Sequence, residues 1–226
     1  MKLLIILITT LTFTSLAIPA TEEISQDCIN KNVPDSERAF SNTFSGTFNG
    51  KRLEYRASLK EKLLYEKDNP SAPMASFFYT EYIVESDKNR PVIFSFNGGP
   101  GSASLWLHMG VLGPKVIKVP SDASDDGSAP YKIVDNKLSP LSDADLVFID
   151  PIGTGYSRAV GCHEPEEFWG VSEDPKIIAE FIRRWINDNK RWNSPRYILG
   201  ESYGGIRGPL LVSELRSGSI LSLIHI

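Results

Sequence analysis

The sequence predicts an α/β fold in which a mixed, mostly parallel sheet is flanked by helices. Patterns of antiparallel strands come first, between residues 39 and 84, and strand, helix and strand then alternate from residue 91 to residue 215. This order is typical of a mixed sheet with a parallel core. Two glycine-rich turns each follow an apolar strand, and ligands of such sheets bind beyond the carboxyl ends of the strands. Both turns therefore lie where a functional site is expected.

The strands are predicted from alternation and from short apolar runs. Apolar and polar residues alternate between residues 39 and 64 around Gly46 and Gly50, which is the pattern of an antiparallel hairpin or meander. Aromatic residues are frequent between residues 75 and 84, which favours a further strand. Short apolar runs predict three buried strands, at residues 91–96, 144–149 and 195–199.

Two helices are predicted in the second half of the chain. Apolar side chains recur at helical spacing between residues 177 and 186, and Ser172 is available as the N-cap of this helix. The second helix follows the last predicted strand, and we expect the run from Leu210 to Leu215 to begin it.

The composition is that of an ordinary globular protein. The chain has 226 residues, of which 41% are hydrophobic and 23% charged, and this length suits one domain with a substantial core. A net charge of −4 leaves no basic patch, so nucleic acid is not an expected partner. Cys162 and His163 are too few ligands for a metal site, and we expect no metal and no cofactor. Cys28 and Cys162 could pair in an oxidising compartment, but two cysteines alone do not establish a bridge.

The first 17 residues read as a secretory signal peptide. Lys2 supplies a short positive region, an apolar segment follows from Leu3 to Leu16, and Ser15-Leu16-Ala17 is a small-x-small cleavage site, with Ala20 as a second option. A membrane anchor is the alternative, but a spanning helix needs about 20 apolar residues and this run is shorter. We therefore expect export to the periplasm or the extracellular space, no stable membrane span, and a domain over residues 18–220.

The segment Gly200-Glu201-Ser202-Tyr203-Gly204 is a G-x-S-x-G motif between an apolar strand and a helix. Such a turn lifts the serine oxygen out of the sheet edge, where it can attack a carbonyl carbon. Glycine at both ends relieves crowding in the sharp turn, and the N–H of Tyr203 is expected to donate to an oxyanion. We interpret Ser202 as a candidate nucleophile; the alternative is an ordinary strand-to-helix loop.

A second turn, Asn97-Gly98-Gly99-Pro100-Gly101, follows the apolar run at residues 91–96. Its backbone N–H groups are free of side-chain obstruction. Enzymes with the G-x-S-x-G turn place another oxyanion donor on the loop after an earlier strand. A plain tight turn is the alternative, but two turns in the right order favour an oxyanion hole.

These motifs resemble those of the serine carboxypeptidase family of α/β-hydrolases. The matching segments are residues 97–104, 150–157 and 200–205, and residues 106–110 and 191–195 resemble the bacterial branch of the family in particular. The resemblance extends over roughly residues 77–209. It implies an α/β-hydrolase fold and a serine-type carboxypeptidase that acts on peptides with a free C-terminus through an acyl-enzyme on Ser202.

The resemblance also implies a role for each residue of the two turns. It assigns the N–H groups of Gly99 and Tyr203 to the oxyanion hole, and it assigns Asn97, Gly98 and Glu201 to the binding of the substrate carboxylate. The substrate carboxylate and the carboxylate of Glu201 would be in contact, and two such groups cannot both ionise without a large energetic cost. We therefore expect peptide hydrolysis to be fastest below neutral pH.

The chain departs from the family pattern at Val111. Eukaryotic members carry a second glutamate at this position, so a Glu–Glu pair cannot form through it here. The resemblance therefore covers the nucleophile turn fully but the site for the substrate carboxylate only in part.

The remaining members of a catalytic triad are not identified in the sequence. The order in the family is Ser, then Asp, then His, and no Asp follows Ser202. We interpret His108 as a packed, hydrogen-bonded histidine, His163 as a residue of a polar loop and Asp150 as a residue that caps or positions the following Gly-Thr-Gly turn. The triad Asp and His, with the C-terminal part of the fold, are therefore expected beyond Ile226.

The last six residues, 221–226, read as a translated sequencing adapter. We therefore expect a truncated gene, a non-native tail and a fragment without activity.

Other functions stay open. A proline iminopeptidase shares the Gly-Gly-Pro-Gly turn but usually has His before it and Trp after the nucleophile, where this chain has Asn97 and Tyr203. Another esterase, or an acyltransferase that passes the acyl group to an alcohol, would use the same scaffold. A secreted binding protein on a catalytically dead scaffold is the non-enzymatic alternative, and the intact Ser202 argues against it. The oligomeric state is not indicated.

Overall fold

The computed structural model describes residues 26–85, 89–119 and 129–217. Its strands are β1 (Ala39–Phe48), β2 (Lys51–Tyr65), β3 (Pro73–Ile83), β4 (Val92–Phe96), β5 (Lys115–Ile117), β6 (Ile133–Asp135), β7 (Asp145–Ile149), β8 (Arg158–Ala159) and β9 (Arg196–Gly200). Its helices are α1 (Gln26–Ile29), α2 (Leu105–Leu107), α3 (Glu173–Asp188) and α4 (Gly204–Ser217). A π-helix, η1 (His108–Leu112), and two 3₁₀ helices, η2 (Pro140–Ser142) and η3 (Pro165–Phe168), complete the described elements.

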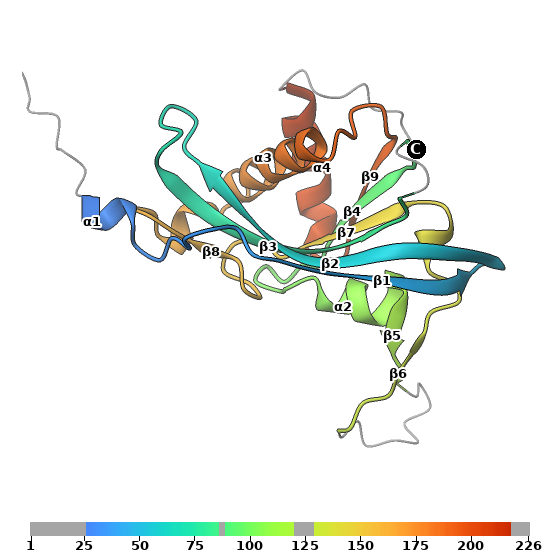
Figure 1. Cartoon of the computed structure of the whole chain (residues 1–226). Helices are drawn as coiled ribbons and strands as arrows, with labels where there is room; N and C mark the ends of the chain where they lie inside the picture. The colour runs from blue at the N-terminus through green and yellow to red at the C-terminus, as the bar shows by residue number, and fades with distance from the viewer. Residues whose placement is uncertain (1–25, 86–88, 120–128, 218–226) are drawn as a thin grey trace, which may run out of the picture.

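The main sheet is mixed, as the sequence predicts. Its strands lie in the order β1-β2-β3-β7-β4-β9, and the short β8 pairs with β3 (Figure 1). The pairs from β1 to β7 are antiparallel, whereas β4 runs parallel to both β7 and β9. The predicted strands are all present, and α3 and α4 flank the sheet. Within the described residues only the β4–β7 and β4–β9 pairs are parallel, so the expectation of a mostly parallel sheet does not hold there, whereas the α/β-hydrolase fold with its flanking helices is confirmed.

The first hairpin closes at a two-residue turn, Asn49-Gly50. Both residues have positive φ, 47° for Asn49 and 79° for Gly50. Two positive φ values characterise the type I′ turn, whose twist matches the twist of paired strands. The hairpin predicted between residues 39 and 64 is confirmed, with β1 and β2 in continuous register from Phe48 to Ala39.

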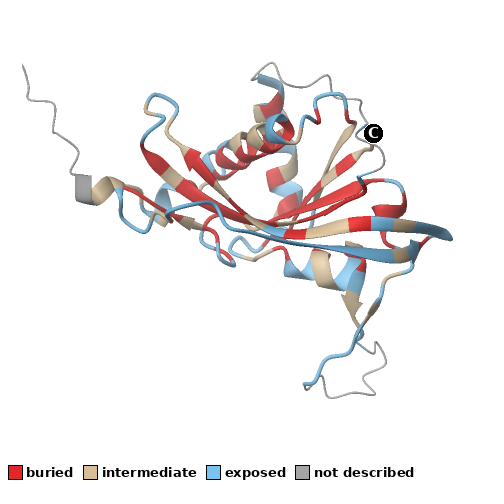
Figure 2. Cartoon of the chain, viewed as in Figure 1, coloured by how far each residue is buried: buried red, intermediate tan, exposed pale blue. Residues whose placement is uncertain are grey.

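The long helices lie on one face of the sheet, and α2 lies on the other (Figure 1). The residues shared by the sheet and the inner sides of α3 and α4 form the larger core, as the red segments of Figure 2 show. Phe181 of α3 contacts the rings of Phe77 and Tyr79 on β3. Leu211 and Leu215 of α4 are also buried in this core. The predicted apolar stripe of α3 is thus the face that covers the sheet.

Two details of the helices differ from prediction. Ser172 occupies the N-cap position of α3, but its side chain makes no capping hydrogen bond. The helix α4 begins at Gly204, six residues before the predicted start at Leu210. Glycine and proline are weak helix formers, and Pro209 lies inside α4. Burial of Leu211 and Leu215 outweighs this weak local preference.

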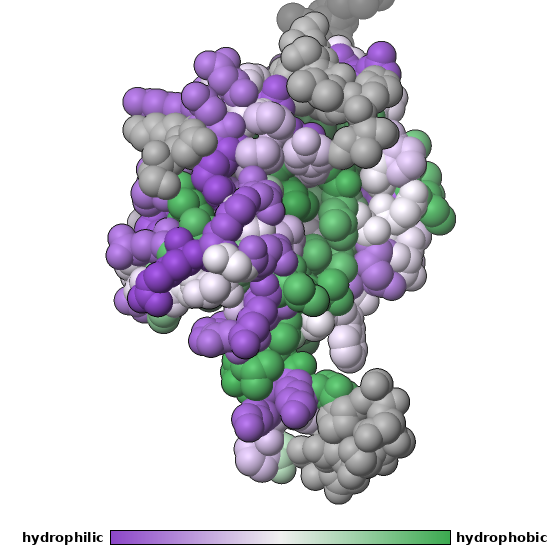
Figure 3. Space-filling model, turned by 90° about the vertical axis from the view of Figure 1, so that its right-hand side faces the viewer, coloured by the Kyte–Doolittle hydropathy of each residue, from purple (hydrophilic) through white to green (hydrophobic). Residues whose placement is uncertain are grey.

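A smaller core fills the opposite face of the sheet. It contains Leu107 of α2 with Tyr55, Tyr82 and Phe148 from the sheet. Beyond it, β5 and β6 pair as a two-stranded arm that projects from the body (Figure 1). The arm exposes apolar side chains, including Ile133, beside polar ones (Figure 3).

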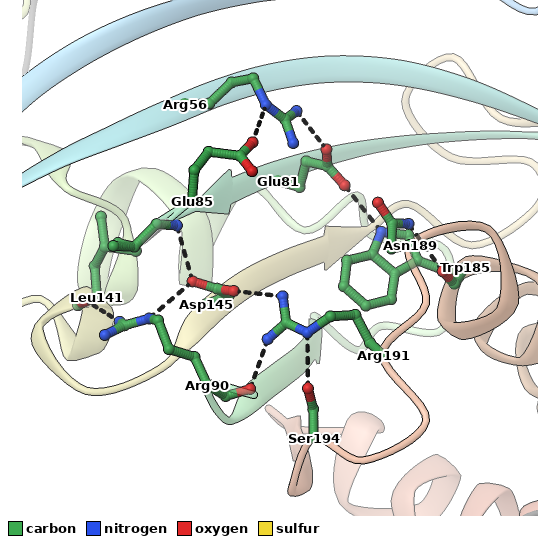
Figure 4. Close-up of polar contacts among 11 residues, drawn as sticks. Arg56, Glu81, Glu85, Arg90, Leu141, Asp145, Trp185, Asn189, Arg191 and Ser194 are labelled. Atoms are coloured by element: carbon green, nitrogen blue, oxygen red, sulfur yellow. Dashed lines mark hydrogen bonds and ion pairs between the residues drawn. The ribbon is translucent and has the colours of Figure 1, made fainter. Parts of the chain in front are cut away.

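A buried ionic network joins the amino-terminal ends of the parallel strands (Figure 4). Asp145, at the start of β7, accepts hydrogen bonds from the Nε of Arg90 at 3.2 Å and the Nη1 of Arg191 at 2.7 Å. It also accepts one from the N–H of Val84 at 3.0 Å. Arg90 precedes β4 and Arg191 precedes β9. One carboxylate therefore fixes the starts of three neighbouring strands, at the end of the sheet opposite the glycine-rich turns.

A disulfide joins Cys28, in α1, to Cys162, in the loop after β8. Among the described residues no helix is long and apolar enough to cross a membrane, and no group of three acidic, histidine or cysteine side chains could hold a metal. The predicted signal peptide, residues 1–17, and the tail, residues 221–226, lie outside the described residues.

Candidate active site

Parallel pairing of β4 and β9 brings the two glycine-rich turns together. Phe96, the last residue of β4, lies opposite Gly200, the last residue of β9. The N–H of Glu201 donates to the carbonyl oxygen of Phe96 at 3.3 Å. The strands β4 and β9 therefore end at the same level of the sheet, and the turns that follow them lie next to each other.

Ser202 lies at the apex of the turn between β9 and α4. It is exposed and has a φ of 57°, in the left-handed region that costs a non-glycine residue about 1–3 kcal/mol. The turn is closed by the N–H of Gly204, which donates to the carbonyl oxygen of Glu201 at 2.8 Å. A Cβ on Gly200 would lie 2.3 Å from the carbonyl oxygen of Gly204, so only glycine fits there. This strained, glycine-dependent turn is the predicted nucleophile turn.

The amide of Asn97 links the two turns. Its Nδ2 donates to the Oε2 of Glu201 at 3.1 Å, and its Oδ1 accepts from the N–H of Leu107 at 3.1 Å. Because Asn97 is fully buried, these bonds fix its orientation and hold the carboxylate of Glu201. The residues predicted to bind a substrate carboxylate are thus brought into one cluster, although their role stays a prediction.

Gly98 packs directly against the nucleophile turn. A Cβ at this position would lie 2.5 Å from the nitrogen of Tyr203 and 2.6 Å from the oxygen of Glu201. The next residue, Gly99, has a φ of 107°. Within the described part of the chain, the N–H groups of Gly99 and Tyr203 donate no hydrogen bond to protein. Neither donor is used within the described fold, and their role in an oxyanion hole stays a prediction.

Because Gly98 lies so close to the nucleophile turn, adding a single methyl group at this position should destabilise the fold. We expect Gly98→Ala to lower the free energy of unfolding of the full-length protein by about 1–3 kcal/mol, because its Cβ overlaps backbone atoms. The displaced turn should also slow the reaction of Ser202 with serine-directed probes. Urea unfolding and probe labelling measure the two effects. The matched control is Gly205→Ala, whose Cβ would meet nothing within 4 Å; equal loss in both variants would contradict the prediction.

A buried ion pair lies beneath the two turns. Arg207 of α4 donates from Nε to the Oδ2 of Asp174 at 2.6 Å, and from Nη1 to the carbonyl oxygen of Asn97 at 2.7 Å. Its guanidinium also lies 5.4 Å from the ring centroid of Tyr203. Burial raises the pKa of Asp174, and the nearby Arg207 charge and hydrogen bond act to lower it. Arg207 therefore ties the end of β4, the start of α3 and the turn after β9 to one another.

A pocket of about 570 Å³ opens beside Tyr203. It is lined by the turn at Pro100, the Gly-Thr-Gly turn after β7, and the segment from Phe168 to Val171. Asp174 and Arg207 also line it. The pocket is therefore continuous with the turn that carries one predicted oxyanion donor.

Neither described histidine serves Ser202. The Nε2 of His108 lies 2.7 Å from the hydroxyl of Tyr82, and its ring stacks on Phe148 with centroids 4.6 Å apart. Burial lowers the pKa of His108 to about 4. Both ring nitrogens of His163 bond to glutamates, through Glu66 and Glu167. Although burial acts to lower the pKa of His163, these glutamates raise it overall. The expectation that His108 is a packed, hydrogen-bonded histidine is confirmed.

Asp150 supports the site instead of joining a triad. Its Oδ1 accepts from the N–H of Ser104 at 2.8 Å. A Cβ on Gly155 would lie 2.2 Å from its Oδ2, so the carboxylate packs against the Gly-Thr-Gly turn as predicted. Burial raises the pKa of Asp150, and the bond from Ser104 acts to lower it. Val111 is exposed on η1, and its carbonyl oxygen accepts from the Nδ2 of Asn136 at 2.7 Å.

Sequence reasoning missed Asp174, Arg207 and Trp169, which surround the two turns. A signal was present for Arg207, which lies among the apolar and glycine positions of α4, whereas Asp174 stands beside Glu173 in the first turn of α3, where acidic residues are common. A lone charge among apolar positions indicates a buried charge that needs a partner. It does not reveal which residue the partner is.

Comparison with known proteins agrees with this geometry. The sequence profile of the family described as serine carboxypeptidase matches residues 60–220. Serine carboxypeptidase-like 9 of Arabidopsis thaliana is 33% identical over 150 residues, which are 64% of this chain and 32% of that protein. Serine carboxypeptidase-like 8 of the same plant is 30% identical over 150 residues, 64% of this chain and 33% of that protein. The chain spans about a third of the length of these relatives. It belongs to the serine carboxypeptidase family.

Proposed function

We propose that the full-length protein containing this chain is a serine-type carboxypeptidase that removes C-terminal residues from peptides. One observation carries the proposal: Ser202 stands exposed at positive φ while Gly98 of the other turn packs against it. Membership of the serine carboxypeptidase family supports the same reaction class. Export to the periplasm or the extracellular space is proposed with it, from the sequence of residues 1–17.

In the proposed reaction, the Oγ of Ser202 attacks the carbonyl carbon of the last peptide bond and gives its proton to a base. The N–H groups of Gly99 and Tyr203 donate to the oxygen that becomes negative. The C–N bond then breaks, the amine of the released residue takes the proton, and the acyl group stays on Ser202. Water hydrolyses this ester. A donor pair of this kind lowers the barrier strongly, because loss of one donor costs about 10²–10³ in rate.

The substrate carboxylate is proposed to bind next to Ser202, at Glu201 and Asn97. Glu201 and the Nδ2 of Asn97 are joined there, next to the N–H groups of the Gly98 turn. No described residue acts as the histidine base. Loss of that base costs a triad enzyme about 10⁶ in kcat, so we expect no measurable turnover from the 226-residue chain alone.

Labelling with a fluorophosphonate probe tests the assignment of Ser202. In the folded full-length protein, mass mapping should place the modification on Ser202, and Ser202→Ala should abolish it. The matched control is Ser213→Ala, an exposed serine two turns along α4, which should label like the wild type. Absence of labelling in the folded wild type would refute the proposed nucleophile.

The carboxylate site predicts an acidic pH preference. A peptide carboxylate beside Glu201 is bound best when one of the two groups is protonated, because two charges in contact repel. We expect kcat/KM for a blocked dipeptide to be higher below neutral pH, and Glu201→Gln to weaken this preference. Glu214→Gln, on α4, should keep the wild-type profile. A flat or alkaline-favouring profile in the wild type would contradict the proposed carboxylate site.

A further inference from the structure

We propose that His163 is the centre of a pH-sensitive clamp, which joins the segment after β2 to η3 while His163 is protonated and opens when it loses the proton. His163 lies in the loop after β8, between Glu66, the first residue after β2, and Glu167 of η3. The chain leads from η3 directly into the wall of the pocket beside Tyr203. The inference concerns the fold and does not depend on the proposed function.

Both nitrogens of the His163 ring contact a carboxylate. Nε2 lies 2.9 Å from the Oε1 of Glu66, and Nδ1 lies 2.8 Å from the Oε2 of Glu167. A neutral imidazole has a single N–H, so it donates to one of these oxygens and turns the lone pair of its other nitrogen towards the second. The protonated ring has two N–H groups and donates to both, with the strength of charge-assisted hydrogen bonds. The observed geometry therefore fits the imidazolium.

The two glutamates also determine the charge around the ring. Burial acts to lower the pKa of His163, but the hydrogen bonds and charges of Glu167 and Glu66 raise it overall. Glu164, in the same loop, is paired with Lys31 at 2.7 Å. His163, Glu66 and Glu167 line a surface hollow of about 1020 Å³ whose other charged residues are four acids and four bases: Asp68, Glu173, Glu180, Glu214, Lys67, Lys176, Arg183 and Arg184. These eight charges balance, so the contacts with Glu66 and Glu167 decide the protonation of the ring.

The clamp lies where several parts of the fold meet. A disulfide attaches the residue before His163 to α1, which lies beside β8 (Figure 1). On the other side, Glu167 is followed by Phe168, which is buried in the larger core, and then by residues 169–171 of the pocket wall. Opening of the contact with Glu167 therefore removes a tie next to this wall, and residues 165–171 should become more mobile.

The sign of the pH dependence follows from the raised pKa of His163. The folded protein binds this proton more tightly than the unfolded chain does. The contribution of the clamp is therefore complete below about pH 6.5, the ordinary pKa of histidine, and is lost as pH rises through the raised value. The side chains of His163, Glu66 and Glu167 are 16%, 33% and 51% exposed, so solvent screens their charges. We therefore expect local loosening and not global unfolding.

Titration of His163 in the full-length protein is the first test. Nuclear magnetic resonance of histidine labelled at Cε1, with His163→Gln to assign the signal, should give a pKa above about 6.5. Glu66→Gln and Glu167→Gln should each lower it. Glu214→Gln is the matched control, because Glu214 lines the same hollow but forms no ion pair with His163 in the described part of the chain; it should keep the wild-type value.

Hydrogen–deuterium exchange is the second test. In the wild type, deuterium uptake of residues 165–171, corrected for the intrinsic effect of pH, should rise by about threefold or more between about pH 5.5 and about pH 8.5. His163→Gln should show no such rise, because an amide does not titrate. Should His163→Gln fail to fold, Glu66→Gln decides, because a neutral imidazole satisfies the one carboxylate that remains and the rise should shrink.

Three results would each overturn the proposal. The first is a pKa of His163 at or below its ordinary value. The second is a corrected uptake of residues 165–171 that does not change with pH in the wild type. The third is a rise in His163→Gln, or in Glu66→Gln where that variant decides, that equals the wild-type rise.

Discussion

Arg207→Met should lower the free energy of unfolding by about 3–5 kcal/mol, because it leaves the buried carboxylate of Asp174 without its partner. Arg207 is 2% exposed, so water cannot replace the lost guanidinium without opening the core. The carbonyl oxygen of Asn97 loses its donor as well. Since that peptide leads into Gly98, we also expect slower labelling of Ser202. Urea unfolding of the full-length protein and the labelling rate measure the two effects.

The deficit of Arg207→Met should depend on pH. Burial raises the pKa of Asp174 in the folded state and Arg207 lowers it, so removing Arg207 raises this pKa further. A folded-state pKa above the unfolded value means that the folded variant binds a proton more tightly than the unfolded chain. The deficit is therefore largest at neutral pH and shrinks as pH falls through the raised pKa of Asp174.

Arg184→Met is the matched control for this pH dependence. Arg184 lies on α3 and pairs with Glu180 at 2.8 Å across the helix surface, where both side chains are partly exposed. Its loss should cost less than about 1 kcal/mol. A deficit in Arg207→Met that equals this control, or that grows on acidification, would contradict the assigned role of the buried pair.

Asp145→Ala should lower the free energy of unfolding by about 3–5 kcal/mol, because it leaves buried arginine side chains without their anionic partner. Asp145 is fully buried and accepts from Arg90, Arg191 and the N–H of Val84 (Figure 4). Arg191 is itself buried. The network lies at the far end of the sheet from Ser202, so the loss should appear as earlier unfolding in urea.

Asp143→Ala tests whether burial is the cause. Asp143 lies two residues before Asp145 and pairs with Lys51 at 2.6 Å, but the two side chains are 66% and 58% exposed. Solvent screens such a pair, so its loss should cost at most about 1 kcal/mol. Similar destabilisation by Asp143→Ala and Asp145→Ala would show that the assigned importance of the buried network is mistaken.

Local patterns predicted the strands well, because each buried strand is a short apolar run with a turn signal at its end. The start of α4 could not be predicted in this way. Its first turns contain Gly204, Gly205, Gly208 and Pro209, which local preference assigns to a loop. Packing of Leu211 and Leu215 into the larger core stabilises these residues as a helix. Tertiary contacts of this kind are invisible to a sequence window.

The two turns of the site were found from sequence, and the family resemblance implied that they adjoin, but local patterns do not reveal the strand order that brings them together. Residues 97–101 and 200–204 are about a hundred positions apart, and β7 lies next to β4 in the sheet although it follows β4 by nearly fifty residues. Only the order β7-β4-β9 makes the turns neighbours. The pairing of Arg207 with Asp174 depends on the same arrangement, so motif reasoning could name the nucleophile turn without naming what supports it.

Phe96 and Gly200 lie opposite each other at the ends of β4 and β9, so the register of these two strands sets the distance between the two turns. Slippage of β9 by one residue along β4 would carry Ser202 about 3.3 Å away from the Gly98 turn. That shift would break the contacts between the two turns and would also exchange the two faces of β9. Deletions within either strand should therefore abolish the proposed labelling of Ser202 even when the motifs themselves are intact, whereas changes of length in the distant β5–β6 arm leave this alignment untouched.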